Sequence, residues 1–519
     1  MSKKYIGITV GPIIDTMLLT TTPAGLWGAS YMFSYFTRRV IENLISKKYV
    51  EEKDFLIPAW NDKNIEIVQK SQGGLLHDRV IFESDREDIL ERTEEVISDM
   101  KEELAEIMYE AIQKYEKERK NKEEIDKNTL IEYMKKYIQT HTMMLEDGKK
   151  IILNMGKYLS TLELERSFIE KEEKNYILKF LENKENISEA KSEFKNEILK
   201  RSKFIKEDWY FFKDKGKNVL SIDDISESAL RHFKDNKDNT KGYFALVQMD
   251  GDNLGKVLGK LNSEKIENFS KACFSYADNA CNIINSYGGK VIYAGGDDVL
   301  FIAPLKGKIE EGSKKEQIDN IFELIHTLTK KFKEEFKGED YGEVTLSAGV
   351  FICYYKYPLY EALKAVFTLL QESKENLKNT ITIQFEKHSS TMGRLQIKNE
   401  FDKNESIANL LENWLIAIKG RDNKKSMLRS IQKKLYVYRN IIKEGLKEKE
   451  KNEVACKLQQ IFRNLFEEVE EISNNIDLEN VKKFLIYSSK KQDIVKVNSI
   501  LEQLDTLISL LNFYEMEGN

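Results

Sequence analysis

The most constraining feature of this sequence is the order of its hydrophobic patterns between about residues 241 and 386. Short runs rich in β-branched residues, which predict strands, alternate with longer runs whose apolar residues recur every three or four positions, which predict helices. Their order is strand, helix, strand, strand, helix, strand, then one more helix and one more strand. The expected strands are residues 244–249, 290–294, 299–302, 344–354 and 380–385, and the expected helices are residues 263–287, 318–336 and 359–377.

This order is that of a ferredoxin-like split βαβ unit, in which the first strand is central and one strand of the hairpin lies beside it. A similar pattern stands near the N-terminus, with strands expected at residues 5–10, 55–57 and 79–82 and a helix around residues 26–44. The remaining segments are highly charged and have the amphipathic pattern of helices. We therefore predict an α+β protein with a first domain at residues 1–84, a helical region at 85–238, a second domain at 239–398 and a C-terminal helical domain at 399–519.

The composition narrows the class of protein. With 41% hydrophobic and 33% charged residues, the chain can bury large cores, and its net charge of −5 restricts nucleic-acid contacts to a local basic patch. The four cysteines include no C-x-x-C pair, so we expect no zinc site, no disulfide framework and a cytoplasmic location. The uncharged residues 16–37 contain Pro23 and two glycines, which favours a buried helix over a membrane span.

Three carboxylates are predicted to meet at one end of the second sheet. Asp250 ends the first strand of this unit, and Asp297 and Asp298 belong to a Gly-Gly-Asp-Asp turn in the following hairpin. Without counter-ions the three would raise one another's pKa, so the cluster implies divalent cations, and hard oxygen ligands select Mg²⁺ or Mn²⁺. Two such ions can activate a hydroxyl and stabilise the leaving oxygen of a phosphoryl displacement.

The neighbours of these carboxylates suit a nucleotide. Gly295 and Gly296 permit positive φ and a close approach of phosphate to the backbone. Asp252 or Asn253 can cap the following helix, whose free amides would face a triphosphate. The alternative is an ordinary hairpin turn with a polar tip.

These motifs resemble the cyclase palm of the large subunit of type III CRISPR effector complexes. The resemblance is carried by the Gly-Gly-Asp-Asp turn, by residues 250–255 (Asp-Gly-Asp-Asn-Leu-Gly), by residues 345–350 (Thr-Leu-Ser-Ala-Gly-Val), and by Ser373-Lys374, similar to a helix-borne Ala-Lys whose lysine meets the triphosphate. Residues 1–83 resemble the first, carboxylate-poor palm of the same subunit, particularly in its Cmr-type variety.

The resemblance implies two palm domains and the synthesis of cyclic oligoadenylates from ATP, activated by target RNA in a complex with guide RNA and other effector subunits. It implies catalysis by Asp250, Asp297 and Asp298, and two Mg²⁺ or Mn²⁺ ions held by these carboxylates and Gly251, with no zinc and no membrane. The implied nucleotide-binding residues are Gly251, Asp252, Asn253, Leu254, Gly295, Gly296, Ser347 and Lys374.

Two departures and two alternatives accompany the resemblance. The family often begins with an HD nuclease domain, but here His77-Asp78 is an isolated dipeptide among five scattered histidines, so we expect no nuclease cluster. The zinc-binding cysteine pairs of many members are also missing.

One alternative is a stand-alone cyclase of the diguanylate (GGDEF) type, in which Glu and Phe would replace Asp298 and Val299. The other is a non-catalytic RNA-binding scaffold, against which the intact carboxylates argue.

A basic segment lies in the C-terminal region. Nine basic residues and one acidic residue stand between residues 419 and 443. A solvated helix face would explain them, but the chain as a whole is slightly acidic, so we predict contact with RNA or an RNA-bearing partner. The residues expected to matter most are Lys424, Lys425, Lys433 and Lys434.

Overall fold

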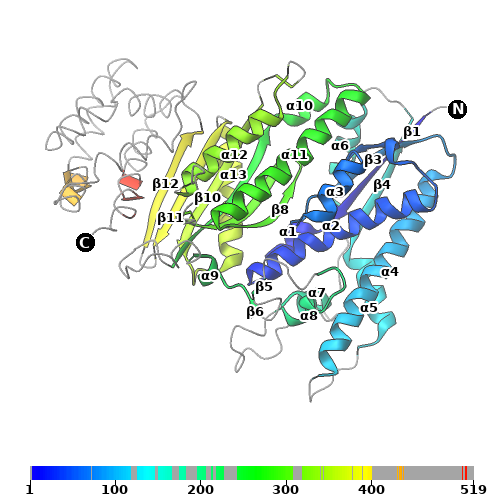
Figure 1. Ribbon diagram of the computed structural model, residues 1–519, viewed down its shortest axis with the longest axis horizontal. Helices are drawn as coiled ribbons and strands as arrows, with labels where there is room; N and C mark the ends of the chain where they lie inside the picture. The colour runs from blue at the N-terminus through cyan, green and yellow to red at the C-terminus, as the bar shows by residue number, and fades with distance from the viewer. Residues whose placement is uncertain are drawn as a thin grey trace.

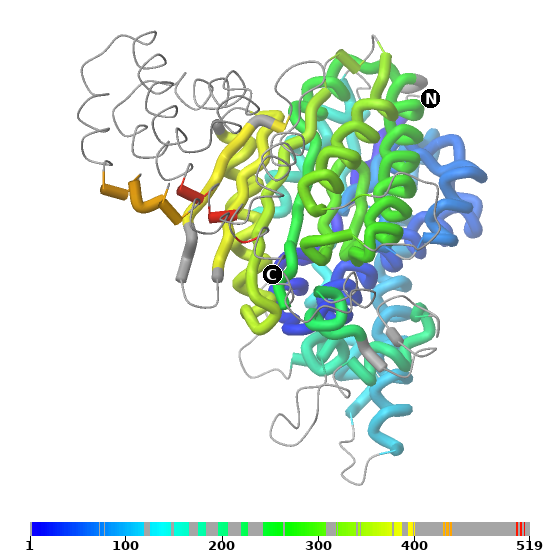
Figure 2. The backbone as a smooth tube through the Cα atoms, turned by 60° about the vertical axis from the view of Figure 1, so that its left-hand side comes forward, coloured from blue at the N-terminus to red at the C-terminus, as the bar shows by residue number. Residues whose placement is uncertain are grey.

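The protein consists of two α/β units that lie side by side, as the computed structural model shows (Figures 1 and 2). The structure describes residues 3–71, 73–76, 78–118, 125–146, 150–165, 175–182, 196–205, 212–213, 218–226, 242–307, 318, 320–338, 341–342, 344–376, 378–387 and 390–399, with short stretches between 429 and 513. Among the helices of these residues, none is long and apolar enough to cross a membrane.

The first unit contains a four-stranded antiparallel sheet in the order β2-β3-β1-β4. Its strands are β1 (Lys4–Gly11), β2 (Phe55–Ile57), β3 (Arg79–Ser84) and β4 (Gln139–Leu145). Its helices are α1 (Ile13–Leu18), α2 (Pro23–Ser46), α3 (Asp62–Lys70), α4 (Ile89–Glu116), α5 (Lys127–Tyr137) and α6 (Ile151–Leu162). The central strand β1 pairs with β3 on one side and β4 on the other, as a ferredoxin-like order requires.

The predicted boundary of the first domain at residue 84 is wrong. The strand β4 pairs with β1 over its whole length, with Gly7 opposite Met143, so the first sheet is complete only at Leu145. The helix α4, predicted from its apolar face, packs against α2 and contacts β4, and therefore also belongs to this unit. The region predicted to be an intervening helical region thus contributes three helices, α4, α5 and α6, and the strand β4 to the first unit.

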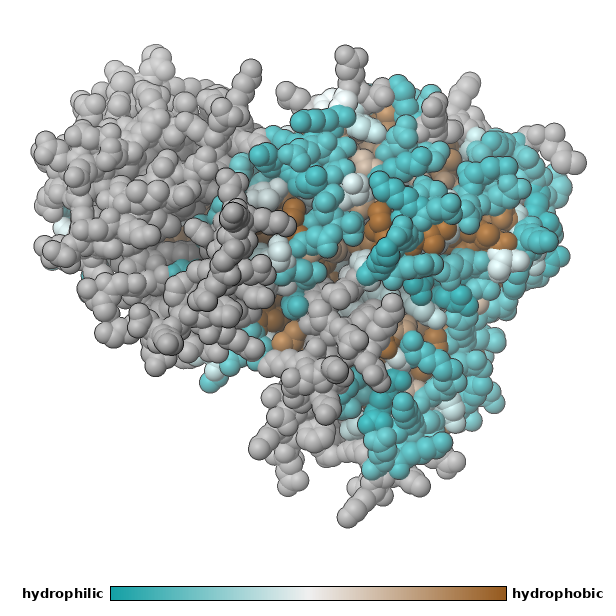
Figure 3. All heavy atoms as spheres, viewed as in Figure 1, coloured by the Kyte–Doolittle hydropathy of each residue, from teal (hydrophilic) through white to brown (hydrophobic). Residues whose placement is uncertain are grey.

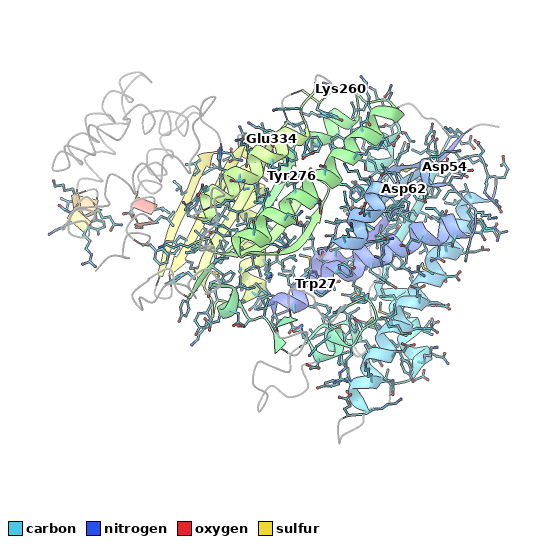
Figure 4. All side chains as sticks on the ribbon, viewed as in Figure 1. Trp27, Asp54, Asp62, Lys260, Tyr276 and Glu334 are labelled. Carbon is cyan, nitrogen blue, oxygen red and sulfur yellow. The ribbon has the colours of Figure 1, made fainter. Side chains whose placement is uncertain are left out.

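The uncharged segment after β1 forms a buried helix, as predicted, although it is divided between α1 and α2. The α2 helix begins with Thr22, whose hydroxyl accepts a hydrogen bond from the Gly25 amide at 3.1 Å, followed by Pro23 at the first helical position. Trp27 (labelled in Figure 4) is fully buried on this helix. The buried Glu182 accepts hydrogen bonds from the backbone of Thr21 and Thr22 just before the helix.

The second unit contains a six-stranded sheet in the order β12-β11-β10-β7-β9-β8. Its strands are β7 (Tyr243–Asp252), β8 (Lys290–Gly295), β9 (Asp298–Pro304), β10 (Thr345–Tyr354), β11 (Thr380–Lys387) and β12 (Ser390–Lys398). Its helices are α10 (Leu254–Leu258), α11 (Ser263–Tyr287), α12 (Ile321–Glu335) and α13 (Leu359–Asn376). Strands β10, β7, β9 and β8 repeat the order of the first sheet, and β11 and β12 extend it.

Smaller elements connect the two units and fill the space beside them. They are η1 (Glu52–Asp54), α7 (Tyr176–Glu182), α8 (Glu197–Lys200), β5 (Phe212–Lys213), β6 (Asn218–Val219) and α9 (Ile222–Ser226). The units are joined by hydrogen bonds as well as by apolar packing. The amide of Ala294 donates to the carbonyl of Gly74 at 3.0 Å, and the amide of Ala59 donates to the Ser270 hydroxyl at 2.8 Å.

Apolar side chains of both units pack into one core. A smaller cluster, formed by α6 on the other face of the first sheet and by residues of the second unit, lies beside it. On the face shown in Figure 3, hydrophilic residues predominate on the helices, and apolar residues show mainly between them. Cys273, Cys281 and Cys353 are free and buried in this core.

Most of the predicted C-terminal helical domain lies outside the described residues, as do Lys424 and Lys425. Lys433 and Lys434 lie on a short helical stretch. Further along the chain, the ring of Phe513 packs against Tyr243 and Phe385 of the second sheet, with ring centroids 4.8 and 4.7 Å apart.

Candidate active site

The predicted convergence of Asp250 with the Gly-Gly-Asp-Asp turn is confirmed by the strand pairing. On β7 and β9, Met249 lies opposite Val299, and the neighbouring positions along the two strands are Asp250 and Asp298. The three carboxylates therefore belong to one end of the second sheet, although about 50 residues separate the two segments in the sequence.

Close packing at this sheet end requires glycine at two positions. Gly296 has a φ of +70°, in the left-handed region where a side chain is disfavoured. A Cβ atom on Gly251 would lie 2.5 Å from the Leu254 side chain and 2.8 Å from Oδ2 of Asp297, so a side chain there would displace the turn. Positive φ was predicted for Gly295 as well, but this residue is part of strand β8 and pairs with Asp298.

The carboxylates of the turn are held in an environment that disfavours their charge. Burial raises the pKa of Asp297 to about 6, although backbone amides, including that of Gly251, donate to this carboxylate and oppose the shift. Burial also raises the pKa of Asp298, and the negative charges of Asp297 and Asp78 add to the effect. Oδ1 of Asp298 is buried and has no hydrogen-bond partner among the described residues. The predicted increase in pKa is thus found, with burial as its main cause.

A tyrosine of α11 lies close to the same turn. Tyr276 (Figure 4) is fully buried, and its hydroxyl has no hydrogen-bond partner within the described part of the chain. Burial and the charges of Asp297 and Asp298 raise the pKa of this hydroxyl, which keeps it protonated. Tyr276 therefore adds an unused donor beneath the turn, and nothing in the sequence pattern distinguishes it from other core aromatic residues.

The side chain of Lys374 is directed at this site and not at solvent. Its Nζ forms an ion pair with the carboxylate of Asp250 and donates to the carbonyl of Gly251 at 3.2 Å. Burial, followed by the nearby charge of Lys378, lowers the pKa of Lys374 to about 8. The helix α13 thus brings a cation to the end of β7.

Asp252 and Ser347 are bonded to each other and do not line an open site. Both are buried, and the Ser347 hydroxyl donates to the Asp252 carboxylate at 2.9 Å. The same carboxylate accepts from the Thr345 hydroxyl at 2.7 Å and from the amide of Asn379 at 2.8 Å. We conclude that this pair joins β7 to β10 and to the loop before β11, instead of contacting a nucleotide as the sequence suggested.

The predicted helix cap and amide cradle after β7 are also not found. Asn253 precedes α10 in a left-handed conformation with a φ of 63°, makes no capping hydrogen bond, and accepts one from Lys378. Asp252 is committed to β10, the Gly251 amide is used by Asp297, and Leu254 is buried. Since α10 has only five residues, this segment is not the anion-binding helix terminus that was expected.

A cavity of about 410 Å³ lies between the two units beside the turn. The second unit lines it with Gly296, Asp297 and aromatic residues of α11, whereas the first unit contributes Asp78 and Lys157 among others. None of the predicted site residues lies in this wall of the first unit. The only signal there was the His77-Asp78 dipeptide, and His77 lies outside the described residues.

The donor set of this site fits divalent cations, although the side chains are not arranged around one. Asp250, Asp297, Asp298 and the Gly251 carbonyl supply hard oxygen donors, and the buried Oδ1 of Asp298 lacks a partner. Within the described ranges, no three His, Cys, Asp or Glu side chains form a group that could hold a metal ion, and Asp250 is paired with Lys374. Binding of a cation would therefore require Asp250 to exchange this ion pair for the metal.

Comparison with known proteins agrees with this geometry. Residues 243–382 match the family model of the Cas10/Cmr2 second palm domain. This segment is therefore similar to a Cas10/Cmr2 second palm domain. A curated relative, the CRISPR system Cmr subunit Cmr2 of Pyrococcus furiosus, is 29% identical over 182 residues, which represent 30% of this chain and 19% of the relative. The matched region is thus about a fifth of that relative's length.

Solved structures share the fold over a larger part of the chain. A chain of the Csm1–Csm4 cassette in complex with cA4 has a TM-score of 0.54 at 14% identity, covering 98% of this chain and 70% of that one. A chain of the type III-B Cmr-beta complex in its apo state has a TM-score of 0.52 at 13% identity, covering 88% and 77%. The two units of this chain therefore share the fold of these chains.

Proposed function

We propose that this protein is the large subunit of a type III CRISPR effector complex and synthesises cyclic oligoadenylates from ATP. The observation that carries the proposal is the convergence of Asp250, Asp297 and Asp298 at one end of a palm sheet, next to a cavity of about 410 Å³ shared with a second ferredoxin-like unit. A cavity of this size suits a nucleotide, and two units around it form two palms of one enzyme.

The molecules bound in the similar structures support the substrate class and the partners. The Csm1–Csm4 cassette has been determined with AMPPNP, with pppApA, with pppApApA and with cA4. By analogy we assign ATP as the substrate, a cyclic oligoadenylate as the product, and a Csm4-like subunit as a partner, together with guide RNA and activating target RNA. Identity of 13–14% supports the fold, so these assignments depend on the site and on the experiment below.

The site residues would divide the chemistry among them. Asp250, Asp297, Asp298 and the Gly251 carbonyl would hold two Mg²⁺ or Mn²⁺ ions, which supply activation of a ribose 3′-hydroxyl and neutralisation of the leaving pyrophosphate. Lys374, released from Asp250 when the cations bind, would place its ammonium group on the triphosphate.

The turn and its support would keep the carboxylates in position. Gly251 and Gly296 allow the backbone to bring Asp297 against the end of β7, and the hydrogen bonds between Asp252 and Ser347 hold β7 to β10 directly behind this point. Asp252 and Ser347 thus support the metal-binding groups without contacting substrate themselves. Rigid support of this kind preserves the catalytic geometry.

The decisive experiment is to assemble the full chain with its effector partners, guide RNA and target RNA, and to incubate the complex with labelled ATP and Mg²⁺. We expect cyclic oligoadenylates and pyrophosphate from the parent complex and none from the Asp297→Ala/Asp298→Ala variant. Asp99→Ala removes an exposed carboxylate that pairs with Lys47 far from the turn, and should retain full activity.

The same assay separates the two alternatives. Cyclic products formed from GTP by the chain alone would favour a stand-alone cyclase of the diguanylate type. An assembled complex that binds target RNA but converts neither nucleotide would show that the chain is a scaffold, and the proposed activity would be refuted.

A further inference from the structure

Equivalent positions in the two units can be identified from their strand registers. In each unit the central strand is the first in chain order and pairs with the third: β1 pairs with β3, and β7 pairs with β9. Near the end of these pairings, Thr9 lies opposite Arg79 in the first unit and Met249 lies opposite Val299 in the second. These two residue pairs therefore mark the same place in the two sheets.

One position further along, the residue on the central strand differs between the two units, whereas the residue opposite it is an aspartate in both. The second unit has Asp250 and Asp298 there. The first unit has Val10 and Asp78, and the Val10 amide donates to the Asp78 carbonyl at 2.8 Å. Asp78 thus occupies the place that Asp298 has in the catalytic turn, whereas Val10 removes the second carboxylate that a metal site would need.

Asp78 lies at the wall of the cavity between the units, opposite the catalytic turn. It lines the same cavity as Gly296 and Asp297, and its negative charge contributes to the raised pKa of Asp298. The neighbouring guanidinium of Arg79 is committed to Glu163, with contacts of 2.9 and 3.0 Å. Among the residues that the structure describes, no side chain donates a hydrogen bond to the carboxylate of Asp78.

A carboxylate in this place restricts what can lie beside it when a nucleotide occupies the cavity. A phosphate group would be repelled, and an apolar group would leave the carboxylate desolvated without a partner, which is unfavourable. The nucleotide groups that satisfy an anionic acceptor are the ribose hydroxyls. Hydrogen bonds to a charged acceptor are also the stronger kind, so such a contact would discriminate well between ribose and deoxyribose.

We propose that Asp78 is a substrate-binding residue contributed by the first unit, and that its carboxylate accepts a hydrogen bond from a ribose hydroxyl of the nucleotide bound in the cavity. This inference rests on the proposed function and deepens it. It gives the metal-free palm a specific contact with the sugar of the substrate.

Binding measurements with the full chain in its assembled complex test this role. Affinities for ATP, 2′-deoxy-ATP and 3′-deoxy-ATP are measured by calorimetry, with Ca²⁺ in place of Mg²⁺ to prevent turnover. We expect the parent protein to bind one of the two deoxynucleotides about tenfold or more weakly than ATP. In Asp78→Ala and Asp78→Asn this preference should disappear or fall sharply, while affinity for that deoxynucleotide remains unchanged.

Several controls keep the result interpretable. Val10 bonds to the backbone carbonyl of Asp78, and the described hydrogen bond of the carboxylate comes from the residue's own backbone amide, so both variants should fold, and thermal melting checks this. The exposed Asp99→Ala variant serves as the matched control. If the Asp78 variants discriminate between ATP and the deoxynucleotides as the parent does, or if they shift only the Ca²⁺ dependence of binding, the inference is overturned. A parent complex that binds no nucleotide at all would instead refute the proposed function.

Discussion

Replacing Asp252 should destabilise the second unit. Replacing the carboxylates proposed as catalytic, Asp250 and the turn residues Asp297 and Asp298, should not. The Asp252 carboxylate is buried and accepts hydrogen bonds from the side chains of Thr345 and Ser347 and from the amide of Asn379, at 2.7 to 2.9 Å. Asp252→Ala removes all of these acceptor contacts at once. It leaves the buried Ser347 hydroxyl without this partner, together with two part-buried donors, the Thr345 hydroxyl and the Asn379 amide.

The magnitude follows from the number and kind of these contacts. A hydrogen bond to a charged group contributes about 1.5–3 kcal/mol, and a buried donor left unsatisfied costs about 1–3 kcal/mol. These contributions overlap, and removal of the Asp252 charge also relieves some repulsion on Asp297. A net loss of about 4 kcal/mol is therefore expected for Asp252→Ala, and about half of that for Asp252→Asn, which retains an acceptor oxygen.

The assay is thermal unfolding of the metal-free chain followed by circular dichroism. For a unit of 150–250 residues each kcal/mol corresponds to about 2–4 °C, so Asp252→Ala should unfold roughly 8–16 °C below the parent protein. Asp297→Ala/Asp298→Ala should unfold at the parent's temperature or above it, because those carboxylates are buried without counter-ions. If Asp252→Ala melts with the parent, or if the turn variant is equally destabilised, the division between structural and catalytic carboxylates is incorrect.

Four further results are expected. The metal-free parent should gain stability relative to Asp297→Ala as the pH falls from about 7 to 4, because the pKa of Asp297 is about 6 in the folded protein and 3.8 ordinarily. The difference in melting temperature between the two proteins, followed across this pH range, measures the gain. Lys374→Ala should raise KM for ATP about tenfold or more with unchanged melting, and Lys374→Arg should restore part of the loss. Glu182→Ala should cost about 3 kcal/mol in urea unfolding, because this buried carboxylate accepts from the backbone and a hydroxyl before α2. Charge reversal at Lys433 and Lys434, together with the two lysines at 424 and 425, should weaken RNA binding and flatten its salt dependence, and equal binding at every salt concentration would contradict this role.

The elements that could be predicted from the sequence are those with a strong pattern of their own. The helix α11 was predicted at the residues where it is found, and the hairpin of β8 and β9 was predicted to within two residues at each end. In contrast, β4 has no clear alternation, and all seven of its residues are only partly buried. Its place is determined by pairing with β1, more than 100 residues earlier in the chain, which local patterning does not reveal.

The same limit applies to the site. The convergence of Asp250, Asp297 and Asp298 could be predicted because strand order alone brings Asp250 to the hairpin turn. The role of Asp252 could not, because it depends on donors from β10 and from the loop after α13. The sequence predicted a nucleotide-binding or helix-capping role for Asp252, whereas its hydrogen bonds make it a structural residue. Asp250, in contrast, is paired with Lys374.

The difference between the two units also assigns the roles of two nucleotides in the proposed reaction. Metal binding needs at least two carboxylates from one sheet end, and only the second unit has them, since Val10 stands where Asp250 would be needed. The nucleotide whose α-phosphate is attacked must therefore lie against the second unit, near Lys374. Asp78, at the equivalent sheet end of the first unit, is then matched to the sugar of the nucleotide on its own side, and the attacking hydroxyl belongs to this sugar. An arrangement with two equal sites would leave the direction of transfer undefined, whereas one residue change between equivalent strands is sufficient to define it.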